Sequence, residues 1–318
     1  MSFDHPVISS LLPVVLLIAI GFVAGKARLI RGEAARDLSN LVFLVLAQAL
    51  LFRTMSSVHV ERLEFKPVVA YFVVAGGLFA AMVLLRGRDS RAAVLGLAAI
   101  FSNTLMIGVP LVGLAYGEAG LVLLFTLISL HSLILLTLTT VVLELLEARE
   151  QSRGANDTPR HLLATVGRAV RNAVIHPVPM PIIAGLLFAQ TGLSLPAVVD
   201  RPLRLLGDAF GPVALVLVGV TLAQAAIGAQ LRGALALSAL KTLLHPLLMA
   251  GVGLAFGLRG LHLAVMVLTA ALPIGANVFL FSQRYQKAEE LVTASVSLST
   301  ALAVLTLSLV LALLPLLP

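Results

Sequence analysis

The sequence predicts an all-α polytopic membrane protein, and three observations support this fold class. Of the 318 residues, 59% are hydrophobic and 12% are charged, and the mean hydropathy is +1.06, far above that of a soluble domain. Ten apolar segments each approach the ~20 residues that cross a bilayer as a helix. Most Lys and Arg residues lie in the short gaps between these segments, which is typical of membrane topology signals.

The ten predicted transmembrane helices form two sets of five. The first set covers residues 7–25, 38–55, 67–85, 92–114 and 119–143, and the second covers residues 172–190, 205–227, 233–256, 261–282 and 291–314. We expect the first helix to be retained. No Lys or Arg precedes Lys26, whereas a signal peptide begins with a basic region.

The distribution of basic residues predicts the orientation of the chain. Of the 22 Lys and Arg residues, fifteen lie in odd-numbered connections, six lie in even-numbered ones, and Lys241 lies inside the eighth span. Because cytoplasmic loops are enriched in Lys and Arg, the odd-numbered connections are predicted to be cytoplasmic. Both termini are then periplasmic or extracellular, and the expected location is the bacterial inner membrane.

The longest connection divides the chain into two halves. Residues 144–171 form a polar linker that includes Gly154 and Pro159, and its second part could be a short interfacial helix. The predicted units are residues 1–143 and 172–318, each with five spans. Because five is odd, a duplicated unit would cross the membrane in the opposite direction the second time. This pattern predicts two inverted five-helix repeats, an arrangement common in transporters.

Composition and motifs argue against several other classes of protein. The chain has no cysteine, which excludes disulfides, thiolate metal sites and cysteine nucleophiles. His131, His176 and His245 lie on separate spans without an adjacent acid, and no His-Glu-x-x-His run occurs. We therefore expect no catalytic residues, no metal site and no enzyme. No basic run alternates with aromatic residues, so nucleic acid is not an expected partner.

The fourth span is interrupted in its middle. Residues 101–110 read Phe-Ser-Asn-Thr-Leu-Met-Ile-Gly-Val-Pro, in which Gly108 and Pro110 weaken helical hydrogen bonding. Asn103 and Thr104 offer side chains that can replace lost backbone bonds. At membrane depth, such a break is tolerated only where the backbone faces protein or a water-filled cavity. A packing kink is the alternative interpretation.

The ninth span carries a similar interruption. Residues 270–279 read Ala-Ala-Leu-Pro-Ile-Gly-Ala-Asn-Val-Phe, with Pro273, Gly275 and Asn277 inside an apolar segment. A tyrosine ends each interrupted segment, at Tyr116 and Tyr285. Interrupted helices at corresponding positions of two halves are the strongest sequence indication of a transport site. The fourth and ninth helices are therefore expected to be broken and to cross.

These motifs resemble the auxin efflux carrier family, which includes bacterial malonate permeases and plant auxin carriers. The resemblance begins with the Asn-Thr-x-x-x-Gly-x-Pro pattern from Asn103 to Pro110 and covers nearly the whole chain. Further matching segments are residues 211–215, 271–279 and 297–300. The resemblance implies ten helices in two inverted repeats, and a mobile domain that moves against a scaffold, as in the related bile acid sodium symporters. It also implies a homodimer.

The second span departs from the family pattern. Where the family commonly has a proline before Ala-Leu-Leu-Phe, this chain has Gln48 followed by Ala49-Leu50-Leu51-Phe52. The change removes an expected kink and places a polar amide there. Gln48 is therefore included among the candidate substrate-binding residues.

The crossing is predicted to bind a small organic anion. Half-helix N-termini present unpaired N–H groups and positive dipole ends, and Asn103, Asn277 and Thr104 add neutral polar groups. Each asparagine could instead cap its own broken helix. The candidate substrate-binding residues are Asn103, Thr104, Gly108, Pro110, Pro273, Gly275, Asn277 and Gln48.

Ion coupling stays open at the level of sequence. No Asp or Glu lies deep in a span, which argues against a cation exchanger. Sodium could bind through backbone carbonyls and the side chains of Thr300 or Gln224, and His131 is the candidate for proton coupling. Lys241 is expected to snorkel or to pair locally. No other cofactor is expected.

The sequence therefore predicts a secondary transporter with the lipid bilayer and a small carboxylate as its partners. The expected substrate is a malonate-like dicarboxylate or a monocarboxylate, with auxin-like acids as a further option, carried by an elevator-like alternating-access motion. The main alternative is a membrane sensor that binds the same ligand at the crossing without transporting it.

Overall fold

The computed structural model describes residues 6–58, 63–151, 179–224 and 230–317. These residues are almost entirely helical, and no strand is formed within them. Six helices of this part are long and apolar enough to span a bilayer, and four shorter apolar helices accompany them. Large apolar side chains such as Leu85, Leu187 and Val198 are exposed on helix surfaces, as expected for helices that face lipid. The fold is that of an integral membrane protein.

The helices of the first half run from α1 to α6. They are α1 (Pro6–Lys26), α2 (Gly32–Leu41), α3 (Ala47–Met55), α4 (Phe65–Arg86), α5 (Ser90–Ile100) and α6 (Val109–Gln151). Single π-helical turns at Val42–Leu46 and Thr104–Gly108 precede α3 and α6. Gly117 lies inside α6 with φ 60° and ψ −153°, so the chain turns there between two helical parts. This residue lies in the predicted connection between the fourth and fifth spans.

The second half contains α8 (Pro179–Ala189), α9 (Ala197–Ala223), α10 (Leu231–Ala239), α11 (His245–Ala255), α12 (Gly260–Ala271), α13 (Asn277–Tyr285) and α14 (Glu289–Leu313). A π-helical turn at Leu240–Leu244 joins α10 to α11, and a short 3-10 turn, Leu314–Leu316, follows α14. The predicted linker and its interfacial helix fall mostly in residues 152–178, outside the described part of the chain.

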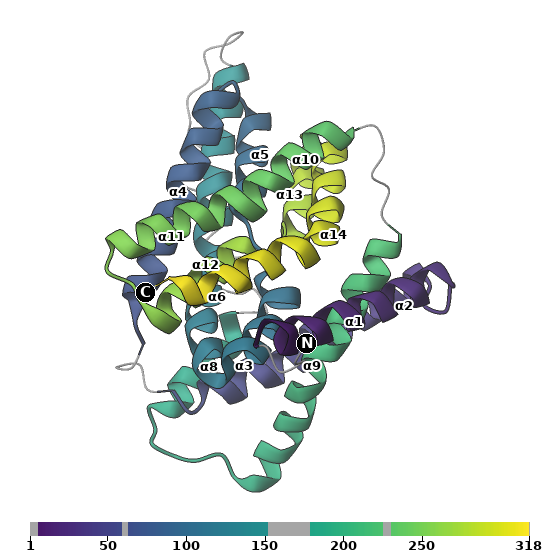
Figure 1. Cartoon of the computed structure of the whole chain (residues 1–318), viewed down its shortest axis with the longest axis vertical. Helices are drawn as coiled ribbons and strands as arrows, with labels where there is room; N and C mark the ends of the chain where they lie inside the picture. The colour runs from purple at the N-terminus through teal and green to yellow at the C-terminus, as the bar shows by residue number, and fades with distance from the viewer. Residues whose placement is uncertain (1–5, 59–62, 152–178, 225–229, 318) are drawn as a thin grey trace.

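The helices separate into two groups in Figure 1. The first helix group contains α1, α2, α3, α8 and α9, which pack on one another in the lower part of the view. The second helix group contains α4, α5, α6 and α10 to α14. Helix α6 contacts both groups, because it also packs on α1, α3 and α8.

The first helix group is held by a close contact between α1 and α9. A Cβ atom added at Gly21 would overlap the carbonyl oxygen of Val216, and one added at Gly219 would overlap that of Ile18. Small residues let two membrane helices approach at backbone distance, which increases van der Waals contact. The two helices therefore form a tightly packed pair.

Ion pairs and a hydrogen bond join residues at the ends of different helices. Arg53 pairs with Asp200 at 2.7 Å, Glu64 with His262 at 3.3 Å, and Glu147 with Lys287 at 3.7 Å. The backbone N–H of Ser90 donates to the carboxylate of Glu150 at 2.7 Å.

Candidate functional site

The chain leaves helical geometry between α5 and α6. Helix α5 begins at an Asp89 cap, whose Oδ1 accepts from Ala92 N at 2.6 Å, and it ends at Ile100. Phe101 is extended, with φ −83° and ψ 108°, and Asn103 has φ −74° and ψ 64°. Asn103 Oδ1 accepts from Met106 N at 3.3 Å, so its side chain caps the turn that begins the next helix. The interruption predicted in the fourth span is present.

A second interruption separates α12 from α13. Helix α12 ends at Ala271, and Leu272 has φ −57° and ψ 149°. Pro273 has no N–H to continue the helix, and helical structure resumes only at Asn277. The interruption predicted in the ninth span is also present.

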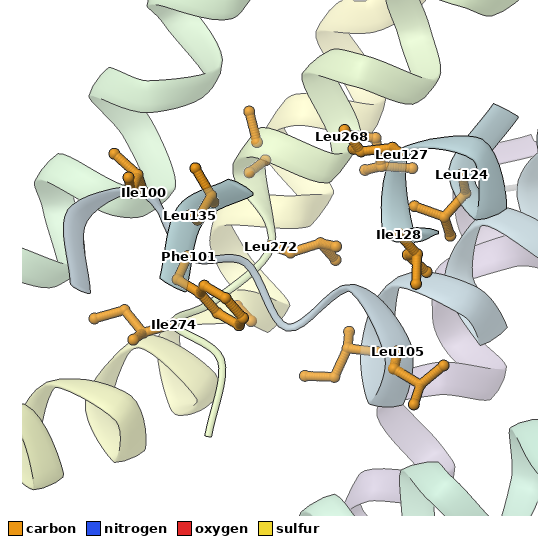
Figure 2. Packing of buried hydrophobic residues seen from close by; sticks show 14 of the residues in the cluster. Ile100, Phe101, Leu105, Leu124, Leu127, Ile128, Leu135, Leu268, Leu272 and Ile274 are labelled. Atoms are coloured by element: carbon orange, nitrogen blue, oxygen red, sulfur yellow. The ribbon is translucent and has the colours of Figure 1, made fainter. Parts of the chain in front are cut away.

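The two interruptions cross and pair through their backbones. Ser102 and Ile274 form an antiparallel bridge. Asn103 N donates to Pro273 O at 2.9 Å, and Gly275 N donates to Phe101 O at 3.0 Å. Figure 2 shows the extended segment after Phe101 passing Leu272 and Ile274 among buried apolar side chains. Backbone groups that the breaks release from their helices are thus satisfied across the crossing.

Glycines permit this close approach. A Cβ atom at Gly275 would lie 2.8 Å from Phe101 Cδ1, and one at Gly108 would lie 2.7 Å from Leu272 Cδ1. Both distances are shorter than normal carbon contacts. Gly108 and Gly275 therefore allow the two segments to pack against each other.

Side chains from neighbouring helices complete the hydrogen bonding of the crossing. Tyr71 on α4 bonds through its hydroxyl to Ser102 Oγ at 3.0 Å. Ser299 on α14 accepts from Ile274 N at 3.1 Å. Lys241, in the π-helical turn before α11, donates to Ala270 O at 2.6 Å and to Leu272 O at 2.7 Å.

The prediction for Lys241 was wrong. Its side chain is fully buried and reaches neither the membrane surface nor a local partner. Its acceptors lie 29 and 31 residues along the chain, so no local pattern in the sequence indicates them.

Two cavities lie at the crossing. The larger, here called the crossover cavity, has a volume of about 310 Å³. Its lining residues are Asn40, Phe43, Leu44, Phe101, Ser102, Asn103, Thr104, Leu105, Met106, Ile128, Ser132, Gly275, Ala276 and Asn277. The lining combines neutral polar side chains with apolar ones, and it includes no charged residue of the described part.

The second cavity, of about 200 Å³, lies between the two helix groups. It shares Phe43, Asn103, Met106 and Ala276 with the crossover cavity. Its remaining lining residues are Ser39, Leu217, Val218, Thr221, Leu222, Val296, Ser297 and Thr300. Asn103 is thus exposed to both spaces, at the boundary between the groups.

Two helix N-termini border the crossover cavity. Asn103 and Thr104 begin the helical structure that leads into α6, and Ala276 and Asn277 begin α13. Within the described residues, the backbone N–H groups of Ala276 and Asn277 have no hydrogen-bond acceptor, as is normal for a first helical turn. This arrangement presents donors and positive dipole ends to one small space.

The two predicted asparagines differ in their contacts. Asn103 caps its helix, as the alternative interpretation expected, and also lines both cavities. Asn277 does not cap α13, because the cap position is Ala276 and no side chain accepts a bond there. Asn277 is only partly buried and lines the crossover cavity.

The other predicted site residues divide into lining and supporting positions. Thr104 and Gly275 line the crossover cavity. Pro273 is buried and supplies a carbonyl to the crossing, and Gly108 packs on Leu272. Pro110 is buried near Gly211 of α9, away from both linings.

Gln48 and His131 are not among the lining residues of either cavity. Gln48 Nε2 donates to Phe43 O at 2.9 Å, and so supports the π-helical turn that places Phe43 in both linings. His131 is buried, with its ring 4.6 Å from that of Phe101 and its Nε2 3.5 Å from the Tyr71 hydroxyl. Its neighbour Ser132 lines the crossover cavity.

Sequence reasoning did not identify several of these positions. Asn40 and Ser132 supply polar groups to the crossover cavity. The three π-helical turns contribute Phe43, Thr104 and Lys241 to the crossing or its cavities, and π-helical turns are often found at functional sites. For Lys241 the sequence did offer a signal, because a lysine within an apolar span is unusual.

Comparison with known proteins identifies the family of this chain. The model of a family described as "Membrane transport protein" matches residues 6–311. The chain belongs to this family, the auxin efflux carrier family, and is therefore a membrane transporter and not an enzyme.

Similar curated proteins cover nearly the same length. A protein of Rhizobium meliloti (strain 1021) named "Putative malonate transporter" is 26% identical, over 93% of this chain and 92% of its own length. "Auxin efflux carrier component 8" of Arabidopsis thaliana is 24% identical, over 95% of each chain. "Uncharacterized transporter YfdV" of Escherichia coli (strain K12) is 26% identical, over 92% of each chain.

Proposed function

We propose that this protein is a secondary transporter of small organic anions that binds its substrate in the crossover cavity. One observation carries the proposal: two helix N-termini and several neutral polar side chains converge on a cavity of about 310 Å³ with no charged lining residue in the described part. Each helix N-terminus acts as roughly half a positive charge. Two of them together suit one carboxylate without a lysine or arginine in contact with it.

The substrate class follows from this chemistry and from the relatives. Asn103, Thr104 and Asn277 can donate to carboxylate oxygens, while Phe101 and Ile128 offer apolar contact. Two relatives are named for the transport of an organic acid, one for malonate and one for auxin. The proposed substrates are therefore malonate-like dicarboxylates or monocarboxylates, including auxin-like acids.

Contacts between connections support the ten-helix topology with inverted repeats. Arg53 with Asp200 joins the second and sixth predicted connections, and Glu64 with His262 joins the second and eighth. The third and ninth connections meet the fifth through Ser90 with Glu150 and Lys287 with Glu147. Even connections contact even ones, and odd connections contact odd ones. A missing or extra span between them would destroy this parity.

The proposed orientation places the odd-numbered connections in the cytoplasm of a bacterial cell and both termini in the periplasm. A surface hollow that contains Tyr116, Gly260 and Pro315 supports the placement of the C-terminus. It brings the end of the chain beside the fourth and eighth connections, which the orientation also puts outside.

The two helix groups suit an elevator-like motion. The crossing belongs to the second helix group, while the glycine-packed α1 and α9 pair belongs to the first. The 200 Å³ cavity lies between the groups, with α9 on one side and α14 on the other. We propose that the second group carries the substrate past the first, and that a homodimer forms through the first group.

Uptake into proteoliposomes tests the proposal. The substrates are labelled malonate and a labelled monocarboxylate, and the variants are Asn103→Ala and Asn277→Ala. We expect both variants to lower uptake about tenfold, because each removes hydrogen bonds to a charged ligand. Thr306→Val is the control, because among the described residues Thr306 Oγ1 bonds only to Leu302 O of its own helix.

The outcome separates transport from sensing. Uptake at the unaltered rate by both asparagine variants would remove them from the site. Binding of the acid to purified protein, seen as a rise in Tm, without flux in liposomes would favour the sensor.

A further inference from the structure

We propose that the ammonium group of Lys241 is a built-in cation of the crossing, so that this protein carries its substrate without an inorganic coupling cation. Its consequences for transport rest on the proposed function, whereas its consequences for cation binding do not. In this proposal the Lys241 amine takes the place of a coupling sodium ion, for which Thr300 and Gln224 are the candidate side-chain ligands in the sequence.

Lys241 ends directly on the second helix break. Its Nζ donates to Ala270 O at 2.6 Å and to Leu272 O at 2.7 Å, the carbonyls of the last turn and C-cap of α12. Such short N···O distances are typical of charge-assisted hydrogen bonds. The side chain has no exposed surface, so it is shielded from bulk solvent.

The position is one where a cation is expected. The C-terminus of a helix carries about half a negative charge, and carbonyls released by a broken helix are common ligands for coupling ions in transporters. In this chain, the amine satisfies two of these carbonyls itself. An inorganic ion that used the same oxygens would have to displace a covalently attached competitor.

No carboxylate balances the lysine. The buried polar and charged side chains of the described residues include no Asp or Glu, and the ion pairs found there do not involve Lys241. His131 and His245 are buried near Lys241, and the ring of Tyr71 packs against both of them. A buried charge without a counter-charge is costly.

The substrate itself can provide the missing counter-charge. Leu272, which accepts from Lys241, is followed by Pro273, and Pro273 O accepts from Asn103 N. Asn103 lines the crossover cavity. The ammonium therefore lies just behind the anion site, and a bound carboxylate would balance it through a medium of low dielectric. Lys241 acts here as a positioning residue.

Transport assays in different salts test this inference. Wild-type uptake of a labelled carboxylate is expected to be equal in sodium, potassium and choline chloride. Lys241→Met, which keeps an unbranched side chain one atom shorter and removes the amine, is expected to raise the KM for the anion at least about tenfold, since it removes a charged partner. The control is Thr242→Val. Thr242 is buried in the same turn, but within the described part of the chain its Oγ1 bonds only to Ser238 O, at 2.9 Å.

Thermal unfolding in detergent tests cation binding without transport. Wild-type Tm is expected to be the same in sodium and choline chloride. In Lys241→Ala, the vacated position should admit a small cation, so that sodium or methylammonium raises Tm while choline does not. Wild-type protein can be measured even if the alanine variant fails to fold.

The two assays distinguish the possible failures. Sodium-dependent uptake or a sodium-dependent Tm in the wild type would overturn the inference, as would an unchanged KM in a folded Lys241→Met protein. If the wild type transports no carboxylate in any salt, the proposed function fails, and the Tm comparison still decides whether Lys241 occupies a cation position.

Discussion

The two helix breaks that cross at the centre of this protein are stabilised in different ways. The break after α5 relies on neutral groups: Asn103 caps the following turn, and the Tyr71 hydroxyl bonds to Ser102. The break after α12 is held by a buried amine, Lys241, and by Ser299 from α14. Similar sequence patterns of Pro, Gly and Asn thus lead to different local chemistry.

The difference shows how one crossing can serve two purposes. The helix N-termini after both breaks border the crossover cavity, where the anion is proposed to bind. Of the two helix ends that precede the breaks, the end of α12 is the one whose carbonyls accept from Lys241. At the break after α5, the carbonyl oxygen of Phe101 instead accepts a hydrogen bond from the backbone N–H of Gly275. Substitutions can separate these roles, because the side chains that stabilise the breaks only partly coincide with those that line the cavity.

The largest expected effect on stability comes from Gly275→Ala, which affects both breaks at once. The added methyl would meet Phe101 Cδ1 at 2.8 Å and Ser102 O at 3.1 Å. Overpacking of this kind costs about 1–3 kcal/mol, so thermal unfolding in detergent should show a clearly lower Tm. Gly251→Ala is the matched control, since a Cβ there meets nothing within 4 Å. Equal Tm values for the two variants would mean that the crossing is not tightly packed.

The second prediction concerns the break after α12. Ser299→Ala would leave the buried Ile274 N–H without its acceptor, which costs about 1–3 kcal/mol. A lowered Tm measures the loss. Ser308→Ala is a control on the same helix, because the one hydrogen bond of Ser308 Oγ to a described residue goes to Val304 O one turn back. A loss no larger than that of Ser308→Ala would show that Ser299 does not support the break.

The third prediction concerns the break after α5. Tyr71→Phe removes the bond to Ser102 Oγ at 3.0 Å and the longer bond to His131 Nε2 at 3.5 Å, but keeps the aromatic packing with His131 and His245. The loss of one neutral hydrogen bond of ordinary length and one long one should cost about 1 kcal/mol, at the lower end of the range for Ser299→Ala. If Tyr71→Phe lowers the Tm more than Ser299→Ala does, the break after α5 depends more on side chains from neighbouring helices than the break after α12.

The smallest expected effect separates the two asparagines. Asn103→Ala loses a helix cap with a long bond of 3.3 Å and should cost about 0.5–1 kcal/mol. Asn277→Ala loses no cap and should stay within about 0.5 kcal/mol of the unaltered protein. Tm measurements on both variants, alongside their uptake rates, check this. A Tm loss for Asn277→Ala that matches Asn103→Ala would contradict the assigned difference.

Much of the architecture could be predicted from local sequence. Hydropathy over a window of about 20 residues identifies apolar helices because the cost of burying polar groups in lipid is large. Pro273, Gly108 and Asn103 mark the breaks because their effects on the backbone act within a few residues. The absence of buried carboxylates is likewise visible in the sequence, and it agrees with the uncharged lining of the cavities.

The tertiary structure alone decided which groups meet at the breaks. The acceptors of Lys241 lie 29 and 31 residues away, and Tyr71 meets Ser102 across 31 residues. Such pairs depend on how α4 packs on α5 and α11 on α12, which no periodicity within one helix contains. For the same reason the sequence showed two alike asparagines, whereas the fold made one a cap and left the other free to face the cavity. The sequence thus determined where the helices had to break, because breaking is a local property of the backbone. Packing between distant helices determined what stabilises each break and where the buried lysine lies.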